Sequence, residues 1–208
     1  MTILALEFSS ERRSVALARD GVLLAEASET GGRDTKAFAL IEKVLATAKI
    51  SREEIEVMAV GLGPGSYTGI RAAIAVAQGW QLARGIKLLG ISSVAALAAE
   101  AQAQNVFGRV NVVVDAQRGE FYLATWEISP ESREEITPLK IVSAAELADR
   151  KSGGEIVVGP GAETALSPRA ARLAQLAAGR RDFVRGEDLS PIYLRETSFV
   201  KAPPGRVF

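Results

Sequence analysis

The chain begins with three stretches whose apolar positions follow the period of β-strands. They are Ile3–Phe8, Ser14–Ala18 and Val22–Ala27. Asp20-Gly21 separates the last two stretches and is a favoured two-residue turn, so these stretches predict a hairpin. From Lys36 the apolar positions recur every three to four residues, which predicts a helix over Thr35–Ala48 with Asp34 or Thr35 as its N-cap.

Strand and helix periods continue to alternate up to about residue 102. Ser51 and Glu54 have the spacing of a capping box for a short turn. The next predicted elements are a strand over Val57–Val60, a helix over Ile70–Arg84, a strand over Lys87–Ile91 and a helix from Ser92 or Ser93 to about Gln102. The predicted order is therefore β-β-β-α-β-α-β-α, in an α/β chain.

Past residue 108 this order begins again. The apolar stretch Val110–Asp115 ends in an acid, as Ile3–Glu7 does, and further matching elements follow it. These are strands over Glu120–Trp126 and Ile136–Val142, a capping box at Ser143 and Glu146 that opens a helix, and Glu155–Gly161 in the place of Glu56–Gly61. Two degenerate copies offset by about 108 residues explain this better than spacing shared by unrelated α/β halves.

The repeat predicts two lobes, residues 1–106 and 107–208, with the second lobe the smaller. The second copy ends in an alanine- and arginine-rich helix over Pro168–Ala178, and Pro191–Arg195 has the pattern of a final docking segment. The first residues enter a strand pattern at once, and no stretch is long and apolar enough for a membrane span. We therefore expect a cytoplasmic protein.

Composition excludes several classes of catalyst. The 208 residues are 48% hydrophobic and 24% charged, which is ordinary for a globular protein. Lysine plus arginine and aspartate plus glutamate both number 25, so no net charge attracts the chain to nucleic acid or an anionic membrane. With 0 His and 0 Cys, the chain excludes histidine-dependent triads, an HExxH zinc site, Cys–His dyads and disulfides. We expect no catalytic residue and no metal site.

The loop Gly61–Gly69 lies between a predicted strand and helix, where backbone N–H groups and the helix dipole favour an anion. It matches neither a Walker A loop nor GxGxxG, because Ser66 stands three positions after Gly63. The alternative is a tight turn in which Thr68 caps the following helix. The candidate residues near an anion or nucleotide are Glu7, Ser9, Gly63, Gly65, Ser66 and Asp115.

Glu7 and Asp115 end equivalent strands of the two copies. In actin-like ATPases such acids flank a phosphate-bound metal, and glycine in the following turn lets the backbone approach phosphate. Here the turns read Glu7-Phe8-Ser9 and Asp115-Ala116-Gln117, with side chains in place of glycine. This favours carboxylates that cap nearby turns over nucleotide hydrolysis.

Two further surfaces remain open to more than one interpretation. The helix Ile70–Arg84 is apolar nearly all round, as expected of a helix buried inside its domain or against a second chain. The only basic cluster comprises Arg169, Arg172, Arg180, Arg181 and Arg185. Acids at Asp182, Glu187 and Asp188 dilute it and no aromatic residues interleave it, which favours a solvated face over contact with RNA phosphates.

Four stretches of the chain form specific motifs, namely Ile3–Ser10, Ala59–Arg71, Val114–Tyr122 and Pro191–Arg195. Together they resemble the TsaB (YeaZ) family, the bacterial subunit required for threonylcarbamoyladenosine (t6A) synthesis on tRNA. The resemblance implies a duplicated actin-like ATPase (ASKHA) fold of two lobes, each with a mixed central sheet and flanking helices. The family looks like a degenerate paralogue of TsaD, whose metal is held by two histidines on its first helix. This chain has 0 His, with Asp34 where TsaB proteins often have one, so the resemblance implies a non-catalytic role at tRNA position 37.

In that family TsaB pairs with TsaD through the first two helices, and TsaE joins the pair near a nucleotide site. The resemblance therefore implies a heterodimer with TsaD, a homodimer when alone, contact with tRNA only through the complex, and no tightly bound cofactor, with ATP or ADP at the complex interface. Carried over to this chain, the partner-binding residues are Thr35, Ala37, Phe38, Leu40, Ile41, Val44, Tyr67, Thr68, Arg71, Ala72, Ala75, Val76 and Gly79.

Two other function classes stay open at this point. A phosphotransferase of the actin-like or sugar kinase class would need a glycine-bearing phosphate turn in both lobes and a larger second lobe. A peptidase, as older naming of the family suggests, would need a nucleophile with a base other than histidine, such as Ser with Lys.

Overall fold

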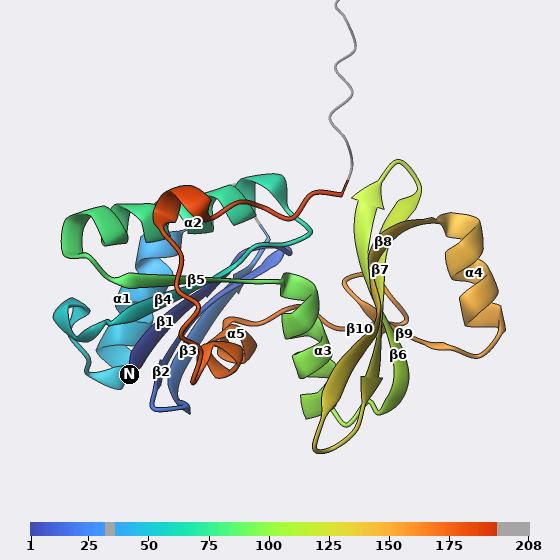
Figure 1. Ribbon diagram of the computed structural model, residues 1–208, viewed down its shortest axis with the longest axis horizontal. Helices are drawn as coiled ribbons and strands as arrows, with labels where there is room; N and C mark the ends of the chain where they lie inside the picture. Colours follow the sequence, from blue (N-terminus) through green and yellow to red (C-terminus); the bar gives the residue numbers. More distant parts are fainter. Residues whose placement is uncertain (32–35, 195–208) are drawn as a thin grey trace, which may run out of the picture.

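The computed structural model describes residues 1–31 and 36–194, which form two five-stranded mixed sheets with flanking helices (Figure 1). The first lobe contains β1 (Thr2–Glu7), β2 (Arg12–Arg19), β3 (Val22–Thr30), α1 (Ala37–Ala48), the 3-10 helix η1 (Arg52–Glu54), β4 (Val57–Gly61), α2 (Tyr67–Arg84) and β5 (Lys87–Ile91). The helix α3 (Ser93–Ala103) leads to β6 (Gly108–Gln117), β7 (Glu120–Ile128), β8 (Arg133–Ser143), α4 (Ala144–Ser152), β9 (Ile156–Gly159) and β10 (Thr164–Ala165). The chain then continues through α5 (Ala170–Ala177) and η2 (Gly186–Asp188).

The two sheets have the same topology, which confirms the predicted repeat. The first sheet has the order β3-β2-β1-β4-β5 and the second, read from its equivalent edge, β8-β7-β6-β9-β10. In each, the first strand pairs antiparallel with the next strand and parallel with the fourth. The turns after β1 and β6 therefore occupy equivalent places.

Both faces of the first sheet are buried, which explains the continuous apolar run of β1. Leu4, Leu6 and Phe8 pack with α1 and α2 on one face. Ile3 and Ala5 pack with α5 on the other. A strand covered on both faces carries apolar residues at every position rather than at alternate ones.

The helix α5 packs on the first sheet although it follows the second sheet in the chain. Its Ala170, Leu173 and Ala174 contribute to the core on the β1 and β2 side, and the Ala170 N–H donates to Ser14 Oγ at 2.9 Å. A helix of the predicted second lobe, residues 107–208, therefore packs on the sheet of the predicted first lobe, residues 1–106. This division of the chain stays a prediction.

Helix starts differ in detail from the predicted ones. Lys36 holds the N-cap position of α1 without a side-chain cap, and the predicted caps Asp34 and Thr35 lie outside the described residues. The helix α2 begins at Tyr67 rather than Ile70, and its cap is Ser66, not Thr68. Ser66 Oγ accepts the Gly69 N–H at 3.3 Å, which satisfies one of the free N–H groups at the start of the helix.

The two predicted capping boxes have different outcomes. Ser51 and Glu54 form one at η1. At α4, Ser143 Oγ accepts the Glu146 N–H at 3.1 Å, but the Glu146 carboxylate binds Lys140 and Arg150 instead. The stronger attraction of two cations explains why this second box is incomplete.

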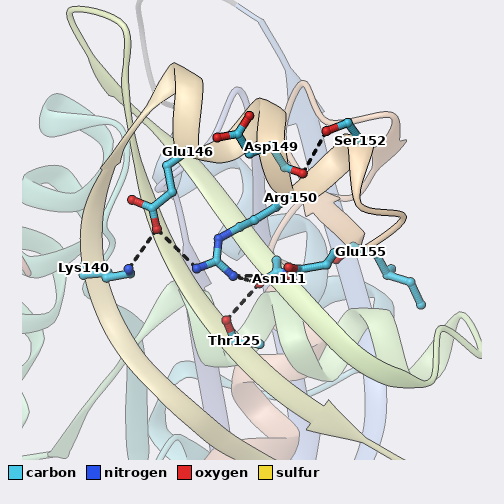
Figure 2. A network of polar contacts seen from close by, with 9 residues as sticks. Asn111, Thr125, Lys140, Glu146, Asp149, Arg150, Ser152 and Glu155 are labelled. Carbon is cyan, nitrogen blue, oxygen red and sulfur yellow. Dashed lines mark hydrogen bonds and ion pairs between the residues drawn. The ribbon is translucent and has the colours of Figure 1, made fainter.

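A polar network supports the second lobe between β6, β7 and α4 (Figure 2). Asn111 is fully buried; its amide nitrogen donates to Glu155 Oε2 at 2.8 Å and its oxygen accepts from Thr125 Oγ1 at 2.9 Å. Arg150 on α4 binds both Glu155 and Glu146 at 3.2 Å. The network fixes α4 against a sheet face that has a smaller apolar core than the first lobe.

Candidate functional site

A cleft of about 790 Å³ separates the two lobes. The equivalent turns after β1 and β6 contribute to opposite walls. The residues around it are Ser9, Ser10, Glu11, Arg12, Thr30, Gly65, Ser66, Tyr67, Val114, Asp115, Ala116, Gln117, Tyr122, Pro160, Gly161, Ala165, Leu166 and Ser167. Among the six predicted anion-proximal residues, Ser9, Gly65, Ser66 and Asp115 therefore line the cleft, whereas Glu7 and Gly63 do not.

Glu7 lies beneath the cleft in the protein interior, with no exposed surface. Its Oε1 accepts the Ser9 N–H at 2.8 Å, and its Oε2 accepts the Ser93 hydroxyl at 2.8 Å. Burial raises the pKa of Glu7, and the hydrogen bonds from Ser9 and Ser93 oppose that rise. The carboxylate thus serves the contact between β1 and α3 rather than the cleft.

Asp115 makes the equivalent contact in the second lobe but is exposed. Its Oδ1 accepts the Gln117 N–H at 2.7 Å, two residues on, as Glu7 accepts the Ser9 N–H. Its Oδ2 accepts from Gln117 Nε2 at 3.0 Å. Both acids therefore cap their own turns, which is the geometry that the glycine-poor sequence favours.

The glycine loop is a tight turn wedged against the turn after β1. A Cβ at Gly65 would overlap the carbonyl oxygen of Ser9, and one at Gly69 would overlap that of Phe8. Gly63 and Gly65 have φ values of 86° and 148°, which L side chains rarely adopt. Glycine at these positions lets the loop and the turn touch.

Several backbone donors of this loop already have partners in the protein. The Ser66 N–H donates to the Ser9 carbonyl at 2.7 Å, and the Gly63 N–H donates to Ser93 Oγ at 3.1 Å. The Gly69 N–H donates to Ser66 Oγ. Because these donors point into the protein, the loop has the chemistry of a structural turn more than that of a phosphate cradle.

The lining of the cleft contains two acidic residues. The acids that line it are Glu11 and Asp115, and Asp115 is committed to Gln117. Within residues 1–31 and 36–194, no three His, Cys, Asp or Glu residues gather in a way that could hold a metal ion.

No helix in the same described ranges is long and apolar enough to cross a membrane.

The predicted partner residues of α1 divide between core and surface. Ala37, Leu40, Ile41 and Val44 are buried in the core of the first lobe, packed toward its sheet. Phe38 is 63% exposed. Thr35 lies outside the described residues. Most of the α1 positions carried over from the family thus lie on the inward face of the helix, and Phe38 is the member that a partner could contact.

The predicted residues of α2 form a continuous outer surface. Tyr67, Thr68, Arg71, Ala75 and Gly79 are exposed, and Ala72 and Val76 are partly exposed. Leu82, which sequence reasoning missed, extends this stripe by one turn and is 89% exposed. Its position three residues after Gly79, on the same face of the helix, could have identified it from the sequence. We call these eight residues the outer face of α2.

A shallow hollow of about 260 Å³ joins this region to α1. Phe38 and Ile41 of α1 and Trp80 and Ala83 of α2 line it together with the charged residues Glu42, Arg52, Glu53 and Arg84. The hollow between the two helices therefore combines apolar and charged side chains.

The C-terminal segment returns to the first lobe beside α2. The Ile192 N–H donates to the Leu62 carbonyl at 2.8 Å. Tyr193 stacks on Tyr67 with ring centroids 5.9 Å apart. The guanidinium of Arg71 also lies over the Tyr67 ring, 4.3 Å from its centroid. The docking predicted for Pro191–Arg195 is confirmed as far as residue 194, where the described chain ends.

The basic cluster is largely neutralised by ion pairs. Arg169 binds Glu26 and Glu100, and Arg172 binds Glu100. Arg180 pairs with Asp182, and Arg185 pairs with Glu187 and Asp188. Asp182, Glu187 and Asp188, the acids that lie among these arginines in the sequence, are thus ion-pair partners of the cluster in the structure.

Comparison with known families relates the whole chain to one group of proteins. A family described as TsaD, tRNA N6-adenosine threonylcarbamoyltransferase, matches residues 34–180. The tRNA threonylcarbamoyladenosine biosynthesis protein TsaB of Escherichia coli is 29% identical, and the alignment covers 99% of this chain and 100% of that protein. The protein of the same name from Bacillus subtilis is 26% identical over 70% of this chain and 64% of its own length.

Solved structures agree with this relation. A Pseudomonas aeruginosa protein described as similar to peptidase YeaZ superposes with a TM-score of 0.82 at 27% identity, covering 93% of this chain and 99% of that chain. YeaZ from the same organism gives a TM-score of 0.80 at 24% identity and the same coverage of 93% and 99%, which shows the fold. With the repeated sheet topology, these likenesses confirm the predicted duplicated actin-like fold.

Proposed function

Because this chain belongs to the TsaB (YeaZ) family of tRNA threonylcarbamoyladenosine biosynthesis proteins, we propose that it is a non-catalytic subunit required for t6A formation at tRNA position 37. It dimerises with TsaD and activates that enzyme together with TsaE. The observation that carries the proposal is the outer face of α2, an exposed helix surface of small and apolar residues beside Phe38 of α1.

The outer face of α2 suits packing against another helix. Gly79 has nothing within 4 Å of the place of a Cβ, and Ala75 stands one turn before it on the same exposed surface. Small residues let a second helix approach closely, and Leu82 and Val76 supply apolar area at the edge of that contact. The same self-complementary face allows an isologous homodimer when TsaD is absent.

A non-catalytic role agrees with the chemistry of this chain. The sequence has 0 His and 0 Cys, so its own acid–base groups would be carboxylates, Lys or Tyr. The equivalent acids Glu7 and Asp115 are engaged by the turns that follow them. On this proposal TsaD carries out threonylcarbamoyl transfer, and this chain holds TsaD in its working arrangement through the shared helix surface.

The proposal places ATP or ADP at the interface of the complex rather than tightly bound to this chain. The lining of the interlobe cleft supports this, because side chains of Ser9 and Gln117 stand in the two turns where an ATPase would have glycine. Contact with tRNA is then made through the complex.

The test mixes this protein with TsaD and measures a 1:1 heterodimer by light scattering after gel filtration. Ala75→Arg should abolish the heterodimer, because burying an unpaired charge in a close helix contact would weaken binding by roughly several kcal/mol. Ala148→Arg on the exposed surface of α4 is the matched control and should bind like the wild type. A folded Ala75→Arg protein that still binds TsaD fully would place the interface elsewhere.

The activity arm incubates threonylcarbamoyl-adenylate and unmodified tRNA with this protein alone, with TsaD alone, and with both plus TsaE and ATP. Multiple turnover only in the full mixture is the expected result. Modified tRNA with this protein alone, or turnover that does not depend on it, would refute a non-catalytic activating role. Tight ATP binding by the isolated chain would favour the kinase class instead, and labelling of a serine by an active-site reagent would favour the peptidase.

A further inference from the structure

A second hollow, of about 290 Å³, lies where α3, α5 and the turn between β7 and β8 meet. Figure 1 shows α3 between the two sheets, with α5 on the side of the first sheet. Arg133 and Arg172 line this hollow together with Gln102 and Gln175. It shares no residue with the interlobe cleft, and none of the residues that line it is acidic.

Arg133 is held in place by a neutral group. Its Nη1 donates to the side-chain oxygen of Gln102. The amide nitrogen of Gln102 donates to the carbonyl oxygens of Ser129 at 2.6 Å and of Pro130 and Ser132 at 3.3 Å. Because a carbonyl oxygen can pair with the NH2 end of an amide but not with its oxygen, the Gln102 oxygen is turned toward Arg133 and fixes the guanidinium.

Arg172 is fixed from the other side of the hollow. Its Nε donates to Glu100 Oε2 at 2.8 Å, and its Nη1 donates to Gln175 Oε1 at 2.9 Å. Glu100 is only 4% exposed, so this anchor is rigid. Within the described part of the chain, Arg172 Nη2 and the Nε and Nη2 of Arg133 have no hydrogen-bond acceptor in the protein.

The charges around the hollow do not balance. Glu26 and Glu100 pair with Arg169 and Arg172 beside the hollow, so the positive charge of Arg133 is in excess. Arg133 makes no ion pair with any described residue. Partial burial and the neighbouring charge of Arg172 both lower the pKa of Arg133. The two guanidinium groups repel each other because no acid lies between them, and a bound anion would relieve this repulsion.

We propose that the Arg133–Arg172 hollow is a binding site for a phosphate group. Two preorganised guanidinium groups offer donors from two sides, which suits the several oxygens of a tetrahedral phosphate better than the two coplanar oxygens of a carboxylate. The volume lies near the lower limit of small-ligand pockets and fits a phosphate with the group that carries it. The phosphate belongs either to a small phosphate ester or to an RNA backbone.

The first arm measures thermal unfolding of the full chain with inorganic phosphate, compared with sodium chloride at equal ionic strength. The wild type and the control Arg109→Gln should be stabilised by phosphate, since Arg109 is exposed on β6 and does not line the hollow. Arg133→Gln should raise the dissociation constant for phosphate at least about tenfold, as expected for loss of a charge-assisted hydrogen bond. Arg133→Lys, which keeps the charge but lacks the fork, provides a second variant if the glutamine protein folds poorly.

The second arm separates the two sources of phosphate by measuring the binding of a tRNA transcript at several salt concentrations. If RNA is the ligand, Arg133→Gln lowers the slope of log K against log salt by about 0.7–0.9, the value for one phosphate contact, while Arg109→Gln leaves it unchanged. An unchanged slope together with a positive first arm assigns the site to a small phosphate ester. The proposal is wrong if phosphate stabilises the wild type no more than chloride, or stabilises Arg133→Gln equally. Neither arm contains TsaD, so this result is independent of the proposed heterodimer.

Discussion

The hydroxyl of Ser93 donates to the Glu7 carboxylate at 2.8 Å, while its oxygen accepts the Gly63 N–H at 3.1 Å. The first residue of α3 thus joins the end of β1 to the glycine loop. A Cβ at Gly61 would overlap the Glu7 carboxylate, so the end of β4 is also shaped around this acid. The buried carboxylate is a structural centre of the first lobe.

The pH dependence of stability should report on Glu7. Burial raises its pKa above the ordinary value of 4.5, so below that value the carboxyl is protonated in both the folded and unfolded chain. As the pH rises above it, the unfolded chain loses this proton first, and the free energy of unfolding falls. Glu7→Gln should remove this fall, measured by urea unfolding between pH 4.5 and 8. Glu163→Gln, which changes an exposed carboxyl, should have the same pH profile as the wild type. Identical profiles for all three proteins would show that Glu7 is not the group whose titration lowers the stability.

Asp115→Asn should leave t6A formation by the complete mixture within about tenfold of the wild-type rate, since a lost transition-state contact typically costs more. Asparagine keeps an oxygen that can accept the Gln117 N–H, so the turn after β6 is preserved. Initial rates with TsaD, TsaE and ATP provide the measurement. A loss of several orders of magnitude in a folded protein would show that Asp115 acts on a reacting group.

Two glycines of α2 should respond in opposite directions to alanine. Gly69→Ala should lower the free energy of unfolding by about 1–3 kcal/mol or more, because the new Cβ meets the Phe8 carbonyl oxygen. Gly79→Ala should raise it by about 0.5–1 kcal/mol, because the new Cβ meets nothing and glycine is a poor helix residue. Urea unfolding of both variants checks this, and equal effects would mean that the loop does not pack against the turn after β1.

Gly79 also tests the helix contact. Gly79→Leu should keep the fold of the isolated chain but weaken binding to TsaD, because its side chain projects from the outer face of α2. Isothermal titration with TsaD gives the affinity. Gly79→Leu binding as tightly as the wild type would show that no helix packs closely at this point.

Asn111→Ala should destabilise the chain by about 1–3 kcal/mol, because Thr125 and Glu155 lose their buried partner. Thr125→Val removes one hydroxyl from the same network. If the two side chains act together, the double variant should lose less than the sum of the single losses in denaturant unfolding. Additive losses would indicate that the contact in Figure 2 is energetically independent.

Most strands of both sheets, and their repeat along the chain, could be predicted because apolar runs such as that of β1 and turn pairs such as Asp20-Gly21 are local signals. The cap of α2 could not, because Ser66 and Thr68 are both good capping residues and the approach of Gly65 to the turn after β1 decides between them. Periodicity identified an apolar stripe on α1, but it could not tell that Leu40 and Val44 face the sheet of their own lobe.

Residues of the site were harder to assign than the elements. Glu7 and Asp115 occupy equivalent positions, and the sequence alone treated both in the same way, as candidates near an anion and as acids that cap nearby turns. The structure separates them, because α3 covers Glu7 while Asp115 stays at the wall of the cleft. The sequence placed Arg172 in a basic cluster but gave no signal for its pairing with Arg133, since the two arginines are distant in sequence and meet only through the packing of β8, α3 and α5.

The position of α5 has a consequence for synthesis of the chain on the ribosome. The sheet of the first lobe is complete once β5 has emerged. Ile3 and Ala5 on one of its faces, however, can be covered only after Ala170, Leu173 and Ala174 of α5 have been synthesised. Contacts between residues so far apart in sequence slow folding and leave apolar surface transiently open. The nascent first lobe therefore passes through a stage in which one face of its sheet is open to chaperones, and it closes only when the second lobe has already been translated.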